Sequence, residues 1–326
     1  MQKQTLKKGL SMALFAALMA LLGLYLYHKR DDLKELLTFD AATVAWILVL
    51  ALGACIANSV YHKLILDTYR MPLTLTDWMG VVFVANVLAF VLPLRADLVF
   101  SATYYKRTKG FAYVKSVSVA AGNIIFTVVF ALLQMLAALV CTGLLEGQWP
   151  AVLWLVWAAC TLAVGAFIVL SLFFQDRMPA FLTRYRKVQE IVTGFNDLLR
   201  NKALLWKLLA CLTANNLLHL FLFMACFQAI GMKVTIYQAL FYNSINRLSS
   251  MVAIVPNNLG IKEAVMGVSS RLMGDLFQNG VVVSLLHSVA LMVVYLVVGG
   301  AFAYPVWRNW KKGPYSLGKT EGNETT

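Results

Sequence analysis

The sequence has few charged residues and lacks the common motifs of enzymes. Charged residues make up 13% of the 326 positions, about half the share found in soluble globular proteins. No His-Glu-x-x-His zinc motif and no Gly-x-Ser-x-Gly nucleophile motif occurs, and the four histidines lack the spacing of metal ligands. The composition therefore argues against a soluble fold. We expect no catalytic residue, no metal site and no cofactor.

Cysteine usage excludes a disulfide framework. The count is odd, no Cys-x-x-Cys occurs, and every cysteine lies inside an apolar run. Such residues are expected to be small buried hydrophobes. They are Cys55, Cys141, Cys160, Cys211 and Cys226.

Long apolar runs dominate what is present. Hydrophobic residues make up 60% of the chain, and the mean hydropathy is +0.73. Since a spanning helix needs about 20 mostly apolar residues, the sequence predicts an all-α polytopic membrane protein. About six runs are long enough, and they lie near residues 9–27, 42–60, 116–145, 151–174, 208–230 and 281–306.

The distribution of basic residues predicts the orientation. With the N-terminus inside, the inner segments hold 20 Lys and Arg residues against four in the outer segments. Both termini are therefore expected in the cytoplasm, and the net charge of +13 is attributed to loops that face anionic lipid rather than nucleic acid. The basic segment 175–207 also has apolar residues at helical spacing, which fits either an amphipathic surface helix or a plain linker.

Two shorter apolar regions are each interrupted by a proline. The first breaks at Pro93, followed by Arg95 and Asp97. The second breaks at Pro256 and continues with two amides, a glycine and two ionisable residues: Asn257, Asn258, Gly260, Lys262 and Glu263. Proline, asparagine and glycine interrupt helices, and ionisable residues at membrane depth are candidates for function. The pattern predicts two re-entrant broken-helix hairpins, at about 76–107 and 236–273.

The two broken regions suggest an internal repeat. Residues 1–150 and 151–312 each read as span, span, hairpin, span, and residues 313–326 form a tail expected to be disordered. Because each half has three crossings, the second half must be inverted relative to the first. Inverted repeats with interrupted helices are typical of transporters with a site near the midplane of the membrane.

The motifs at the two breaks resemble those of a known family. Pro93, Arg95 and Asp97, with Pro256, Gly260 and Glu263 in the second half, are similar to the flippase-like transmembrane domain of lysylphosphatidylglycerol synthetases. The resemblance covers about residues 10–305 and implies movement of a polar lipid between the leaflets of a bacterial or archaeal cytoplasmic membrane. The soluble transferase domain of those synthetases is absent from the sequence, so aminoacylation is not expected.

The charged residues at the breaks suggest how a lipid headgroup would bind. Arg95 and Arg247 are suited to bidentate phosphate binding, and Lys262 adds a point charge. The helix after Gly260 offers backbone donors for an anion. Asp97 and Glu263 would balance these cations, bind a cationic headgroup or carry protons. In the alternative, structural interpretation, Arg95–Asp97 and Lys262–Glu263 only neutralise each other.

Other polar residues inside the spans are expected to form hydrogen bonds between helices. They are Asn215, Asn216, His219, Asn243 and Asn246.

Three functions fit these features. The first is a transporter of a phospholipid or a polyprenyl-phosphate-linked lipid. The second is a membrane enzyme that modifies a lipid headgroup, with Glu263 or Asp97 as its base. The third is a non-catalytic protein that recruits a lipid-modifying enzyme through the basic segment.

Overall fold

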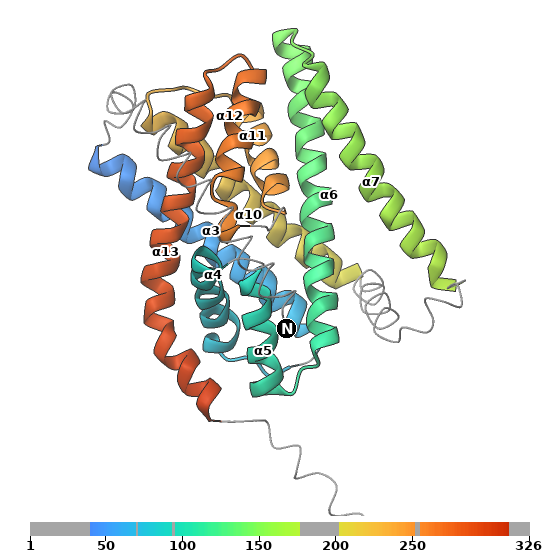
Figure 1. The fold of residues 1–326 in the computed structure, drawn as a ribbon, viewed down its shortest axis with the longest axis vertical. Helices are drawn as coiled ribbons and strands as arrows, with labels where there is room; N and C mark the ends of the chain where they lie inside the picture. Colours follow the sequence, from blue (N-terminus) through green and yellow to red (C-terminus); the bar gives the residue numbers. More distant parts are fainter. Residues whose placement is uncertain (1–39, 70, 93–94, 177–201, 252–254, 313–326) are drawn as a thin grey trace, which may run out of the picture.

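The computed structural model describes residues 40–69, 71–92, 95–176, 202–251 and 255–312. These residues form nine α-helices and no strand (Figure 1). The all-α prediction is confirmed. The predicted first span, most of the basic segment 175–207 and the C-terminal tail lie outside the described residues.

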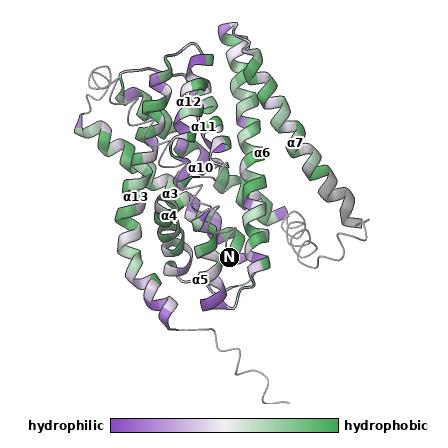
Figure 2. Ribbon diagram, in the orientation of Figure 1, coloured by the Kyte–Doolittle hydropathy of each residue, from purple (hydrophilic) through white to green (hydrophobic). Residues whose placement is uncertain are grey.

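Within the described ranges, four helices are long and apolar enough to cross a membrane. They are α3 (Ala41–Asp67), α6 (Tyr113–Glu146), α10 (Lys202–Ala229) and α13 (Phe277–Lys311). Each was predicted as a span. A further predicted span, 151–174, corresponds to α7 (Ala151–Asp176), whose apolar part Ala151–Ala166 is shorter than those of the other four helices. Figure 2 shows hydrophobic residues along most of α6, α7 and α13, as expected for helices that contact lipid tails. The chain is therefore a multi-pass membrane protein.

Shorter helices occupy the two regions that the sequence marks as broken. The first region contains the π-helical turn η1 (Thr76–Gly80), α4 (Val81–Val91) and α5 (Ala96–Lys109). The second contains α11 (Ile236–Ser249), the 3₁₀ turn η2 (Pro256–Asn258) and α12 (Ile261–Leu272). Within each region the two α-helices pack against each other.

The helix pairs pack on the long helices in a crossed arrangement. Helix α4 lies against α13, α11 lies against α6, and α3 and α10 pack together between them. The main apolar core draws on all of these helices and includes Phe83, Met135, Phe223, Tyr242 and Met266. In the described chain, the only helix against which α7 packs extensively is α6. The two helices diverge from the connector that joins them (Figure 1).

Helix α13 approaches both helix pairs closely at glycines. A Cβ added at Gly280 would collide with the backbone carbonyl of Met266 on α12. A Cβ added at Gly299 would lie 2.9 Å from Val87 Cγ2 and 3.3 Å from the Phe83 oxygen, both on α4. The backbone of α12 is thus packed directly against α13 at Gly280, whereas α4 meets α13 at Gly299 through the Val87 side chain and the Phe83 backbone.

A buried carboxylate ties the start of the first helix pair to its end. Asp77, at the start of η1, is 2% exposed. Its Oδ1 accepts a hydrogen bond from the Tyr104 hydroxyl at 2.8 Å, and its Oδ2 is 2.8 Å from Lys109 Nζ. Oδ2 also accepts hydrogen bonds from the backbone and hydroxyl of Thr74, at 2.9 and 2.8 Å. These contacts fix the end of the pair opposite its break.

Candidate functional site

The first break lies between α4 and α5. The α4 C-cap, Leu92, is extended, and Arg95 adopts a left-handed conformation with φ of 57° at the N-cap of α5. A non-glycine residue in this conformation costs about 1–2 kcal/mol. Arg95 Nε is 3.8 Å from Asp97 Oδ1, and this buried nitrogen has no hydrogen-bond partner. Pro93, the predicted breaking residue, lies outside the described residues.

The second break contains a buried proline and three nearby residues with positive φ angles. Pro256 is buried and starts η2, where it needs no hydrogen bond from its nitrogen. Asn257, Asn258 and Gly260 have positive φ angles of 47°, 55° and 86°. The Asn258 side chain holds this turn against α11, because its Nδ2 donates to the Ser250 oxygen at 2.7 Å.

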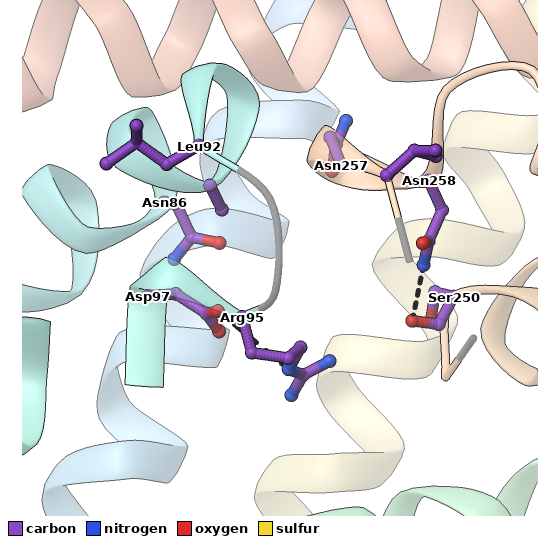
Figure 3. A pocket seen from close by; sticks show the side chains of 9 residues that line it. Asn86, Leu92, Arg95, Asp97, Ser250, Asn257 and Asn258 are labelled. Atoms are coloured by element: carbon purple, nitrogen blue, oxygen red, sulfur yellow. Dashed lines mark hydrogen bonds and ion pairs between the residues drawn. The ribbon is translucent and has the colours of Figure 1, made fainter. Parts of the chain in front are cut away.

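The two breaks face one cavity of about 130 Å³. Figure 3 shows Asn86, Arg95 and Asp97 on one side of it and Ser250, Asn257 and Asn258 on the other. One water needs only about 10–15 Å³ measured this way, so the cavity has room for a small polar group. It is lined by one guanidinium, one carboxylate and the amides of three asparagines, groups that can form hydrogen bonds and ion pairs with a charged ligand.

A second cavity of about 70 Å³ adjoins the first, because both are lined by Asn86 and Asp97. It lies among α3, α4, α5 and α6. Its other polar lining residues are His62, Ser101, Tyr105 and Ser116. The hydroxyl of Ser116 is buried without a hydrogen-bond partner. Polar groups therefore continue from the first break towards the start of α6.

Glu263 does not line either of these cavities but caps its own helix. The side chain is 0% exposed, and its Oε2 accepts a hydrogen bond from the Gly260 amide at 2.6 Å. Oε1 accepts hydrogen bonds from the Ser284 and Ser288 hydroxyls, at 3.3 and 3.5 Å. The sequence predicted that the start of this helix would offer backbone donors to an anion. The Gly260 amide is not available for this, because it already donates to Glu263.

Arg247 and Lys262 form no ion pair within the described part of the chain. Arg247 Nη2 donates to Asn215 Oδ1 at 2.7 Å, and its buried Nε has no hydrogen-bond partner. Lys262 Nζ lies 3.2 Å from Ser288 Oγ and forms no ion pair with Glu263. The suggested neutralisation of Lys262 by Glu263 is thus wrong as a direct contact, whereas Arg95 and Asp97 do form an ion pair.

The predicted residues fall into two groups. Arg95, Asp97, Asn257 and Asn258 line the first cavity. The others, Gly260, Arg247, Lys262 and Glu263, belong to a polar cluster among α10, α11, α12 and α13.

The sequence interpretation missed two polar residues of the cavity, Asn86 and Ser250. Asn86 was detectable as a lone amide in the apolar run 78–92, whereas nothing in the sequence distinguishes Ser250.

Several predicted hydrogen bonds between helices are confirmed. Asn215 Nδ2 donates to the Ala54 oxygen at 2.8 Å, which joins α10 to α3. Asn243 Nδ2 lies 3.4 Å from Asn216 Oδ1, and His219 Nδ1 lies 3.1 Å from His287 Nε2. The side-chain oxygens of Asn243 and Asn246 are buried without a hydrogen-bond partner.

Comparison with known proteins agrees with this architecture. No curated protein and no solved structure matches the chain. The family model described as "Lysylphosphatidylglycerol synthase TM region" matches residues 9–299, which include both breaks and every residue named above as lining the cavities. The chain belongs to the lysylphosphatidylglycerol synthase transmembrane-region family.

Proposed function

We propose that this protein moves a lipid with a phosphate headgroup between the two leaflets of a bacterial or archaeal cytoplasmic membrane. The observation that carries the proposal is that two helix breaks meet at one polar cavity inside an apolar bundle. Irregular backbone at membrane depth is tolerated where it lines such a cavity. The headgroup would cross through the cavity while the lipid tails stay outside the bundle.

The crossed packing of the helices supports an inverted repeat. If α4 corresponds to α11 and α6 to α13, then the contact of α4 with α13 has its counterpart in the contact of α11 with α6. Helices α3 and α10, the corresponding pair between them, pack on each other as a two-fold axis requires. We infer that the two helix pairs are re-entrant hairpins from opposite sides. The bias of basic residues assigns both termini to the cytoplasm.

The cavity residues divide the tasks of headgroup binding. Arg95 presents a buried donor without a partner, which suits a phosphate oxygen. Asp97 keeps the site near neutrality when it is empty and would bind an amine in a zwitterionic headgroup. Asn257 and Asn258 offer amides from the opposite side. Glycerophospholipids and polyprenyl-phosphate-linked lipids both carry the phosphate that this arrangement would recognise.

Reconstitution in proteoliposomes tests the proposal. Fluorescent phosphatidylglycerol and phosphatidylcholine are placed in both leaflets, and a membrane-impermeant reductant quenches the outer one. Protein-containing vesicles should lose more than half of the signal, whereas protein-free vesicles should lose about half. Equal losses for both lipids in both preparations would contradict the proposal. A changed lipid mass after incubation would instead favour a headgroup-modifying enzyme.

A further inference from the structure

Two histidines, one buried and one partly buried, form a pair that the proposed headgroup cavity does not include. His219 lies on α10 and His287 on α13, with 3.1 Å between Nδ1 of the first and Nε2 of the second. His287 is 2% exposed, and its ring stacks on Phe223 at 4.3 Å between centroids. The two rings are thus held in place inside the bundle.

The pair has an unused position for a proton. A hydrogen bond between two imidazole nitrogens needs one proton, which either ring can supply. The other nitrogen of His287, Nδ1, is buried without a hydrogen-bond partner. If the ring is neutral and donates through Nε2, Nδ1 is a free acceptor. An additional proton can be placed there without breaking the bond to His219.

Positive charges surround this position from two other helices. Arg247 of α11 binds Asn215, which precedes His219 by one turn of α10. Lys262 of α12 donates to Ser288, the neighbour of His287 on α13. Both cations act electrostatically on the two histidines. The one carboxylate in the cluster is Glu263, so the described groups carry one more positive than negative charge while the histidine pair is neutral.

This arrangement links protons to anions. A second positive charge beside Arg247 and Lys262 is unfavourable, and a bound phosphate would remove that penalty. Linkage is reciprocal, so a proton on the pair strengthens anion binding as much as the anion strengthens proton binding.

Resting on the proposed function, we infer that the His219–His287 pair takes up a proton when an anionic lipid headgroup reaches Arg247 and Lys262. The lipid would then move with its charge compensated by a proton, so a pH gradient across the membrane would drive its transport in one direction.

Calorimetry of the full-length protein in detergent tests the inference. Soluble dihexanoylphosphatidylglycerol is titrated at one pH in two buffers of different ionisation enthalpy, and the difference in heat gives the number of protons taken up. We expect uptake approaching about one proton per lipid for the wild type. His219→Gln and His287→Gln should abolish it while lipid still binds. Dihexanoylglycerol, which has no phosphate, should cause no uptake.

The outcomes separate this inference from the function on which it rests. Lipid binding without proton uptake by the wild type, or unchanged uptake in both variants, would overturn the histidine assignment alone. Failure of the wild type to bind or move any phospholipid would overturn both. Should a variant not fold, the wild type decides. As the pH falls through the range in which the pair titrates, its affinity for dihexanoylphosphatidylglycerol must rise about tenfold per pH unit, and a pH-independent affinity contradicts the inference.

Discussion

The two helix breaks differ in how their charged residues are used. At the first, Arg95 and Asp97 lie at a cavity, are partly exposed and form a long ion pair of 3.8 Å. At the second, Glu263 is fully buried and accepts three hydrogen bonds within the protein. A group whose hydrogen bonds are already made has little capacity for a ligand. Arg95 and Asp97 are therefore suited to contact with a headgroup, whereas Glu263 is suited to holding the opposite wall in place.

The largest loss of stability is expected from Glu263→Ala at the second break. This change leaves the Gly260 amide and two serine hydroxyls without their acceptor, and removes the one carboxylate near Lys262. Loss of a buried charged partner costs about 3–5 kcal/mol, so the variant should unfold in mild detergent. Thermal unfolding followed by size-exclusion chromatography measures this. Glu146→Ala is the matched control, because Glu146 is an exposed carboxylate bonded to Tyr237. Equal melting temperatures for Glu263→Ala and Glu146→Ala would show that the buried carboxylate contributes no more to stability than the exposed one.

A second large loss of stability is expected from a change at Asp77, at the end of the first helix pair opposite its break. Asp77→Asn places an amide among Lys109, Tyr104 and Thr74, and removes the charge that Lys109 needs. We expect a loss of about 3 kcal/mol in the free energy of unfolding. Asp67→Asn removes an exposed ion pair with Lys63 and should cost less than about 1 kcal/mol. Denaturation of both variants in detergent measures the two losses in unfolding free energy. Similar losses would show that the buried contacts of Asp77 contribute no more to stability than an exposed ion pair.

Arg95 sharpens the comparison by separating transport from stability. Arg95→Gly relieves the left-handed backbone, which should stabilise the fold by about 1 kcal/mol. The same change removes the proposed phosphate ligand, so lipid movement should fall about 10- to 100-fold, the equivalent of one charged hydrogen bond. Arg271→Gln, a change at an exposed arginine of α12, controls for lost charge. Undiminished transport by Arg95→Gly would remove Arg95 from the site.

The smallest effects compare two neighbouring asparagines of the second break. Both have positive φ, but Asn258 alone bonds the Ser250 oxygen. Asn257→Gly should therefore be neutral or slightly stabilising, whereas Asn258→Gly should cost about 1 kcal/mol. Differential scanning fluorimetry resolves this difference. A larger loss for Asn257→Gly would indicate that its side chain has a structural role.

Much of the helical layout was predictable because it depends on local composition. Apolar runs define α3, α6, α10 and α13, and Pro256 with its asparagines marks the second break. The pairing of ionisable groups was not predictable. Lys262 and Glu263 are adjacent in sequence yet form no ion pair and meet only through the Ser288 hydroxyl, since neighbours on a helix point about 100° apart. The meeting of His219 with His287 depends on how α10 packs against α13, which no local pattern records.

The glycine contacts of α13 have a mechanical consequence. At Gly280 the backbone of α12 packs directly on α13, so no flexible side chain can absorb a displacement between them. At Gly299 the stiff, branched side chain of Val87 and the Phe83 backbone bring α4 nearly as close to α13. If the two helix pairs act as the gates of the proposed transporter, α13 would couple their movements. A shift that opened one side of the bundle would then be transmitted to the other.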